Sequence, residues 1–490
     1  MLAIFPLRRE SACATRGHGR IGKQQAGVGM TRNDAVLAAR ANRSTFIALL
    51  AILVFAIALG GGGSKYGLAN LMVQLAALVA LSFHRKAFLA FWSDTPLALR
   101  TLVLLTLLVP LIQIIPLPPA IWTALPGREL VAQSLSLVAE DGAANAWYPA
   151  SLDPIRTLLA LTGLIAPLAL LVIGFSSRRS TLITIGWIAV ALGLANFLLG
   201  VPQVLSNSET GVLYPENPMP GILFGTFANR NSTGLFLVGV LALATLLPAP
   251  ERVNHIAPML RFVTCVLLVL AIVLTRSRTA IVLALIPLAI AGFRIFAGRS
   301  RYHHFMPRGH HWIWIAGAGV VVTLFAAILI SSPGRMGMAL ERFDKGIEDA
   351  RIYIWDDSTY AAERYWPVGS GMGTFSEVFQ VDESLENMTV RRAGRAHNDY
   401  LEVAIEAGLP GLALVAAWLV TIGWLSWRAR RSPDRWIAWA GATVLLCIAL
   451  QSITDYPLRN QALLVIASLA LVLLVRFSSS RETEMGGQST

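Results

Sequence analysis

Residues 46–60 have the sequence FIALLAILVFAIALG, a run without a charged side chain. Uncharged runs recur along the chain, for example at Leu102 to Pro116 and Trp312 to Ile330. A helix needs roughly 20 predominantly apolar residues to span a bilayer. Several runs reach that length once their mildly polar ends are included. We therefore predict an all-α integral membrane protein.

The composition agrees with this prediction. Of 490 residues, 55% are hydrophobic and 14% are charged, whereas a soluble domain carries about 25% charged residues. The net charge of +12 could suggest nucleic acid, but the lysines and arginines form short clusters between apolar runs. Such clusters mark the cytoplasmic side of a membrane protein, so no nucleic-acid partner is expected. Cys265 and Cys447 lie inside apolar runs, so no disulfide framework is predicted.

Hydropathy predicts about 12 transmembrane helices. They lie near residues 45–60, 66–83, 100–116, 156–174, 181–200, 224–247, 259–275, 279–296, 312–330, 402–426, 436–452 and 459–476. The basic clusters alternate: they fall in the first tail, in the even-numbered connections and in the last tail. By the positive-inside rule both termini are cytoplasmic, and the odd-numbered connections face outward.

The spans divide the chain into regions. These are a basic, disordered cytoplasmic tail at 1–44, nine spans at 45–330, an outward loop at 331–401, three spans at 402–476 and a cytoplasmic tail at 477–490. The large loop has apolar positions at roughly helical spacing between Arg335 and Arg364, followed by a glycine-rich break at Gly369 to Gly373. A loop of this length is usually functional or disordered, and its aromatic side chains favour function.

Arginines on the outward side need an explanation, because an arginine within a span costs about 2.5–3.5 kcal/mol. Arg276 and Arg278 occupy a tight link between two apolar runs. They either snorkel to the interface or bind an anion, and binding is favoured for Arg278. Arg230, within Asn229-Arg230-Asn231, marks either a helix cap or an anion site. Arg351 lies on the predicted loop helix, where a surface salt bridge is the simpler interpretation.

His397 is the histidine that the predicted topology places on the outward side. A neutral imidazole is the usual general base near pH 7, although a structural role fits the position equally well. Asp399 or Glu402 is expected to orient the ring, and Asp455, at the last outward turn, to pair with an arginine. No metal site or cofactor is predicted, with Asp356–Asp357 only a weak candidate for Mg²⁺.

Four motifs follow one another in the second half of the chain. They are Gly371-Met372-Gly373-Thr374-Phe375, His397-Asn398-Asp399-Tyr400-Leu401, Glu406-Ala407-Gly408-Leu409-Pro410-Gly411 and Asp455-Tyr456-Pro457. In this order they resemble the O-antigen ligase and polymerase family, over roughly residues 220–460. That family has about 12 spans and a large periplasmic loop between the ninth and the tenth, where hydropathy also places the large loop of this chain.

The resemblance implies metal-independent, inverting transfer of a glycan from undecaprenyl pyrophosphate to an acceptor hydroxyl, on the periplasmic side of the bacterial inner membrane. It implies that Arg278 and Arg351 hold the pyrophosphate and that His397 activates the acceptor. Less securely placed binding candidates are Arg230 and Arg276. Supporting roles fall to Asp399, Tyr400, Glu406 and Asp455.

Two kinds of alternative stay open. With the same chemistry, a ligase transfers the glycan to lipid A–core, a polymerase extends another lipid-linked glycan, and a protein O-oligosaccharyltransferase modifies serine or threonine. A polysaccharide transporter or flippase would instead place ionisable residues near mid-membrane, often on broken helices. The candidate residues cluster at one face, which favours the enzyme. Sequence leaves the sugar, the acceptor and the oligomeric state open.

Overall fold

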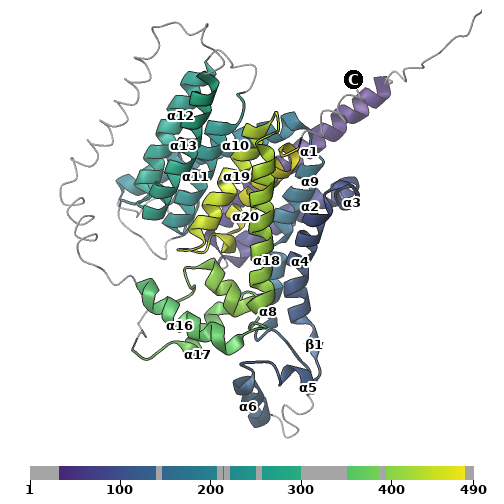
Figure 1. The fold of residues 1–490 in the computed structure, drawn as a ribbon, viewed down its shortest axis with the longest axis vertical. Coiled ribbons are helices and arrows are strands. Elements are labelled where there is room, and N and C mark those ends of the chain that lie inside the picture. The colour runs from purple at the N-terminus through teal and green to yellow at the C-terminus, as the bar shows by residue number, and fades with distance from the viewer. Residues whose placement is uncertain are drawn as a thin grey trace, which may run out of the picture. The chain divides into compact units, whose positions relative to one another are not determined.

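The computed structural model describes residues 32–63, 65–138, 146–206, 213–214, 221–249, 256–299, 350–386, 388 and 393–479. The chain divides into two units, residues 1–41 and 42–490. Of the first unit only the start of a helix is described. The second unit is mainly helical, and Figure 1 shows its helices by label.

The helices and the few extended residues follow one another along the chain. The first part contains α1 (Arg32–Leu59), η1 (Gly60–Gly62), α2 (Gly67–Phe83), α3 (Arg85–Asp94), α4 (Leu97–Ile114), β1 (Pro116–Leu117), α5 (Pro119–Trp122), α6 (Glu129–Val138) and β2 (Tyr148–Pro149). The middle contains α8 (Pro154–Thr162), α9 (Ile165–Phe175), α10 (Arg179–Leu205), α11 (Arg230–Leu246), α12 (Ala257–Leu274) and α13 (Arg278–Arg299). The last part contains α16 (Ala350–Tyr365), α17 (Phe375–Asp382), α18 (Asp399–Ala429), α19 (Arg435–Gln451), η3 (Pro457–Arg459) and α20 (Gln461–Phe477).

The N-terminal tail differs from the expectation. A disordered tail was predicted for 1–44, but α1 already begins at Arg32. No glycine or proline interrupts residues 32–59, so the good helix formers before the apolar run extend it as one helix. The remainder of the predicted tail, residues 1–31, lies outside the described residues.

Membrane-spanning helices dominate the described part of the chain. Seven helices are long and apolar enough to cross a bilayer, or eight if α2 and α3, which are bent by 81°, form one span. Shorter apolar helices are α11, α19 and α20. Every predicted span overlaps an apolar helix, or for 156–174 the consecutive helices α8 and α9, except 312–330, which falls outside the described ranges. The chain is thus a multi-pass helical membrane protein, and the count of 12 spans stays a prediction.

The orientation of the helices also stays a prediction, and reporter fusions test it. The positive-inside rule places the 331–401 loop in the periplasm and the C-terminus in the cytoplasm. A reporter enzyme active only in the periplasm should therefore be active when fused at Glu383 and silent when fused at Ser478. The reverse pattern would place the candidate site on the cytoplasmic face and overturn its proposed donor.

The centre of the bundle is formed by α11. All its residues from Ser232 to Leu246 are buried, and it packs against α10, α12, α13 and α19. A helix that is apolar on every side belongs in a core. Because neighbours surround α11 from Ser232 onward, the start of this helix is packed against the helices around it.

Outside the bundle, α16 and α17 pack on the beginning of α18. The predicted glycine-rich break lies between α16 and α17, and Gly371 has a positive φ of 114°. A side chain there would meet Ser151, with a Cβ–Oγ distance of 2.3 Å. At Gly408, where α18 kinks, a Cβ would lie 2.1 Å from the Pro367 carbonyl oxygen. Glycine is required at both places because backbone approaches backbone or a neighbouring side chain.

Candidate active site

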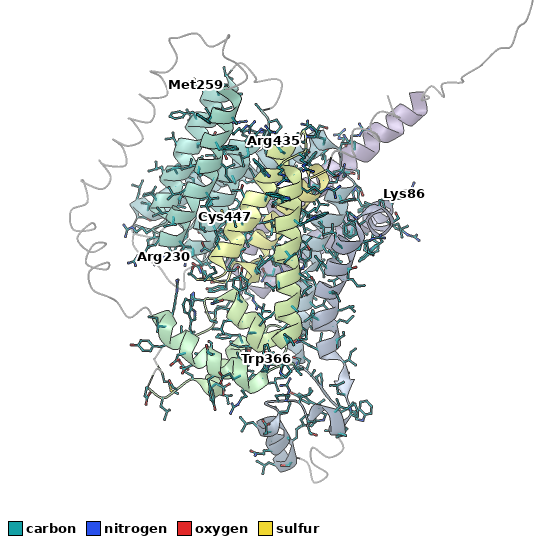
Figure 2. All side chains as sticks on the ribbon, in the orientation of Figure 1. Lys86, Arg230, Met259, Trp366, Arg435 and Cys447 are labelled. Atoms are coloured by element: carbon teal, nitrogen blue, oxygen red, sulfur yellow. The ribbon has the colours of Figure 1, made fainter. Side chains whose placement is uncertain are left out.

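The candidate residues lie at one end of the bundle, where α11, α13, α18 and α20 begin and α12 and α19 end. Figure 2 shows Arg230 toward the end that carries Trp366, with Met259 and Arg435 toward the other end. The Asn398 side chain caps α18 by accepting hydrogen bonds from the backbone N–H groups of Tyr400 and Leu401, at 3.0 and 3.1 Å. This cap fixes where α18 starts, and hence where the preceding residue lies.

That preceding residue is His397, and its imidazole faces Asp455. The distance from His397 Nδ1 to Asp455 Oδ1 is 3.2 Å. The Asp455 side chain is buried, while that of His397 is 31% exposed. The Tyr456 ring packs against the imidazole edge-to-face, with the ring centroids 5.0 Å apart. Burial, together with the Asp455 carboxylate, raises the pKa of Tyr456 to about 12, so its hydroxyl stays protonated.

Asn229 links this pair to the start of α11. Its Nδ2 donates to Asp455 Oδ2 at 3.5 Å and to the Tyr456 hydroxyl at 3.3 Å. Its Oδ1 accepts from the backbone N–H of Asn231 at 2.8 Å and so caps the helix. The segment was predicted to be either a helix cap or an anion site. Asn229 does cap the helix, and this cap lies directly beside His397 and Asp455.

The link continues to the turn between α12 and α13. Ser277 Oγ donates to Asn231 Oδ1 at 2.9 Å, and Ser277 stands between Arg276 and Arg278. Hydrogen bonds thus connect the two-arginine turn to the start of α11, and from there to the histidine. The structure brings together four stretches that are far apart in the sequence.

Two of the candidate residues have unusual backbone. Among the described residues other than glycine, only Arg276 and His397 have positive φ, at 52° and 53°. Left-handed backbone in such residues costs about 1–3 kcal/mol, persists only where the surroundings enforce it, and clusters at functional sites. This observation favours a functional role for both turns.

Arg351 approaches the site through its own helix. It stands one helical turn before Trp355 on α16, and Trp355 Nε1 donates to the carbonyl oxygen of Ala396 at 2.8 Å. Since Ala396 precedes His397 directly, the start of α16 packs beside the histidine segment. Residues three or four apart share one helix face, which places Arg351 on the same side as Trp355.

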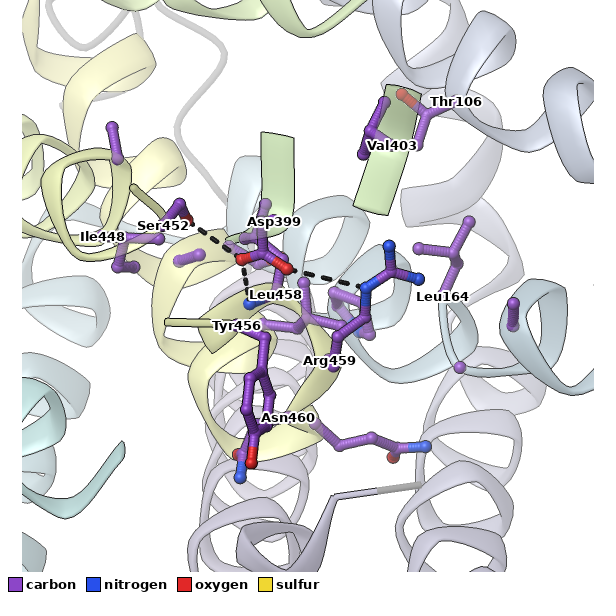
Figure 3. Close-up of a pocket in the computed structure, with 18 of the residues that line it drawn as sticks. Thr106, Leu164, Asp399, Val403, Ile448, Ser452, Tyr456, Leu458, Arg459 and Asn460 are labelled. Atoms are coloured by element: carbon purple, nitrogen blue, oxygen red, sulfur yellow. Dashed lines mark hydrogen bonds and ion pairs between the residues drawn. The ribbon is translucent and has the colours of Figure 1, made fainter. Parts of the chain in front are cut away.

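The acidic residues of α18 have a different role from the one expected. Neither Asp399 nor Glu402, the residues expected to orient the imidazole, contacts the ring directly; the direct contact comes from Asp455. Helical spacing places Asp399, Glu402 and Glu406 on one face, toward the guanidinium of Arg459. The Arg459 nitrogens lie 3.6 Å from Asp399, 3.2 Å from Glu402 and 2.7 Å from Glu406, and Figure 3 shows Asp399 with its partners.

This buried cluster joins the neighbouring segments to α18. Asp399 Oδ2 accepts from the Ser452 hydroxyl at 3.0 Å and from the Leu458 backbone N–H at 3.1 Å, on both sides of the turn that carries Asp455. Glu406 Oε1 accepts from the Phe375 backbone N–H at 3.2 Å. The Glu-x-Gly and Gly-x-Gly-x-Phe motifs are therefore in direct contact through Glu406.

Arg459 is the residue that sequence reasoning missed. Burial alone would lower the pKa of Arg459, but the carboxylates of Glu406, Glu402 and Asp399 outweigh burial and raise it. The guanidinium is therefore charged and holds three buried acids. The sequence did contain a signal for it: Arg459 is an arginine at the outward edge of the last predicted span, and an arginine on the outward side was the criterion that selected Arg276 and Arg278.

A large cavity opens beside these groups. Its volume is about 1830 Å³, against roughly 300–1,000 Å³ for an ordinary small-molecule pocket. At the site end of the bundle the lining includes His397, Tyr456, Asn229, Arg395 and Lys65. Most other lining side chains are apolar and come from α4, α9, α18, α19 and α20. The cavity can hold a molecule with a charged head and a long apolar tail.

Metal ligation has little support in the described part of the chain. No group of three or more His, Cys, Asp or Glu side chains gathers there. Of the weak candidate pair, Asp357 accepts from the backbone N–H and the hydroxyl of Ser384, at 3.2 and 3.3 Å. Those contacts give Asp357 a structural role in joining α16 to the segment after α17.

The fold and this chamber define a class: a multi-pass membrane protein with a polar site at one end of an apolar cavity. The family model described as O-antigen ligase matches residues 263–416. Residues 263–416 are therefore similar to the O-antigen ligase family, as the motifs predicted, and this similarity points to a role in surface-polysaccharide biosynthesis.

The matched region is narrower than the expected 220–460. It contains Arg276, Arg278, Arg351 and His397, whereas Arg230, Asp455 and Arg459 lie outside it. No curated protein matches the chain.

Proposed function

We propose that this protein transfers a glycan from a polyprenyl pyrophosphate, undecaprenyl pyrophosphate in bacteria, to an acceptor hydroxyl on the periplasmic face of the inner membrane. The observation that carries the proposal is the cavity, which has His397 at its polar end, in contact with Asp455 behind it, and mostly apolar side chains along the rest. A lipid-linked glycan needs such a chamber, since its tail is apolar and its reacting bond lies beside a diphosphate.

His397 is the general base. When its Nδ1–H donates to Asp455, the other ring nitrogen, Nε2, keeps its lone pair. The acceptor oxygen bonds to the anomeric carbon from the face opposite the pyrophosphate and gives its proton to Nε2. The bond from that carbon to the pyrophosphate oxygen breaks, and its electron pair leaves with the pyrophosphate. Configuration at the sugar is therefore inverted.

Arginines neutralise the leaving group. Arg278 and Arg351 hold the pyrophosphate, with Arg230 and Arg276 contributing to the same positive region. Guanidinium groups bind phosphate oxygens through two parallel hydrogen bonds, and fixed charges at developing negative charge are an effective form of catalysis. Such a clamp needs no metal ion, so we expect transfer to proceed in the presence of a chelator.

A ligase, a polymerase and a protein transferase share this chemistry and differ in the acceptor. Deletion of the gene tests both the chemistry and the identity of the acceptor. Loss of a lipid A–core ligase should leave polymeric glycan on the lipid carrier. Loss of a polymerase should leave single repeat units there, and loss of a protein transferase should remove glycan from proteins. The family description favours the ligase. Unchanged surface glycans and lipid-linked intermediates would contradict the proposed function.

Complementation of the deletion tests the arginines. Arg278→Lys and Arg351→Lys keep the charge but lose the planar fork, so each should restore transfer only weakly. Arg179→Lys, on an exposed pair with Asp434, serves as a matched control and should restore it fully. Full restoration by both site variants would refute the clamp.

A further inference from the structure

The segment before α18 has a strained conformation that something must hold. His397 has a φ of 53°, a conformation that a residue with a Cβ adopts only under constraint. Both polar backbone groups of the preceding residue, Ala396, are engaged. Its N–H donates to Glu402 Oε1 at 2.9 Å, and its carbonyl oxygen accepts from Trp355 Nε1 at 2.8 Å. The two peptide groups on either side of Ala396 are therefore each held by a side chain.

Glu402 makes this contact under unusual conditions. The residue is fully buried, and its second oxygen, Oε2, lies 3.2 Å from both Arg395 Nη1 and Arg459 Nε. Two guanidinium groups thus fix the carboxylate while its other oxygen holds the Ala396 N–H. A buried carboxylate with charged partners and a backbone donor has little freedom to move.

Capping does not explain this arrangement. In a capping box, an acidic side chain in the first turn bonds to the N–H of the N-cap residue. Here Asn398 is the N-cap and satisfies α18 by itself. Glu402 instead reaches two residues further back, past His397, to Ala396. Its contact serves the segment before the helix and not the helix.

We infer that Glu402 is a positioning residue: it holds Ala396 so that the left-handed backbone of His397 directs the imidazole against Asp455. This inference rests on the proposed function for its catalytic consequence, since a base displaced by about 1 Å can lose roughly 100-fold in rate. Arg395 and Arg459 act through Glu402 by fixing its carboxylate. The donor still binds when Glu402 is lost, because its binding groups lie on other elements.

The kinetic test compares Glu402→Ala and Glu402→Gln with Asp382→Asn. Asp382 is a second buried carboxylate, and its partner is Arg364 on α16 and not a residue of the histidine segment. Glu402→Ala should lower kcat about 100-fold with KM for the lipid-linked donor unchanged. Glu402→Gln keeps an oxygen for the Ala396 N–H and should recover part of kcat. Asp382→Asn should keep the wild-type kcat.

Amide hydrogen exchange tests whether Glu402 holds the segment before α18, and it does so without a measurement of activity. In Glu402→Ala the backbone amide of Ala396 loses its acceptor, so peptides covering residues 393–398 should exchange faster than in the wild type. Asp382→Asn should leave those peptides unchanged. If Glu402→Ala keeps both its kcat and its exchange pattern, the inference is wrong. If Glu402→Ala and Asp382→Asn lose stability equally with kcat intact, Glu402 belongs to a structural ion pair only.

Failure of the proposed function can be told apart from failure of the inference. If the wild-type protein transfers no glycan to lipid A–core, lipid-linked glycan or protein acceptors, the proposed function fails. The exchange measurement then still decides whether Glu402 holds the histidine segment. Slow exchange at 393–398 that survives in both Glu402 variants would overturn the positioning role whatever the activity.

Discussion

Replacing His397 by alanine should give a folded, membrane-inserted protein that binds lipid-linked donor and transfers almost no glycan. A positioned base typically contributes about 10²–10⁴-fold to a proton transfer, and the initial rate of transfer by the purified protein should fall by that factor. Donor binding should persist, because the arginines proposed to hold the pyrophosphate lie on α13 and α16 and not on the histidine segment.

Two further variants sharpen this result. Asp455→Asn keeps the size of the side chain but removes the charge 3.2 Å from Nδ1, so its rate should fall between those of the wild type and His397→Ala. His84→Ala is the matched control, since His84 bonds to the Ala80 carbonyl oxygen at the bend between α2 and α3. It should transfer normally. An undiminished rate in His397→Ala would make the histidine structural and move the search for a base to Asp455.

Much of the fold could be predicted because hydropathy is a property of each run by itself. Apolar runs fold into helices in a bilayer regardless of their neighbours, and each predicted run within the described residues overlaps a helix. Direction was harder to predict. The sequence predicts a span at 66–83 but not the 81° bend into α3, because hydropathy measures how apolar a segment is and not where the chain turns.

The site could be predicted in its parts but not in its pairings. His397 was selected because it is the histidine that the predicted topology places on the outward side. The outward arginines were selected because a charge in a membrane is costly. Its partner was missed because Asp455 lies 58 residues further along and reaches the imidazole only through the packing of α18 on α19. Local spacing favoured Asp399 and Glu402, yet the periodicity of α18 turns those carboxylates toward Arg459.

Replacing Arg459 by alanine should cost more stability than any other single change in the described part of the site. The substitution leaves Asp399, Glu402 and Glu406 buried, with Arg395 alone facing Glu402. Removing one partner of a buried ion pair destabilises by about 3–5 kcal/mol. The free energy of unfolding in detergent should fall by at least that amount, and the yield of folded protein with it.

Arg179→Ala is the control for losing an arginine. Its partner, Asp434, lies 2.7 Å away, but the Arg179 side chain is 54% exposed, and exposed pairs contribute only about 0–1 kcal/mol. If Arg459→Ala proved as stable as Arg179→Ala, the buried acids would not depend on Arg459 for their charge balance.

A second substitution distinguishes the loss of charge balance from the loss of packing. Glu406→Gln added to Arg459→Ala removes one unpaired carboxylate and should restore part of the lost stability, whereas in the wild-type background it should destabilise. This change of sign is an interaction energy between contacting residues. If Arg459→Ala destabilised the protein only by leaving a cavity, Glu406→Gln would restore no stability, because glutamine and glutamate have nearly the same volume. Only an electrostatic role for Arg459 makes Glu406→Gln stabilising in the variant and destabilising in the wild type.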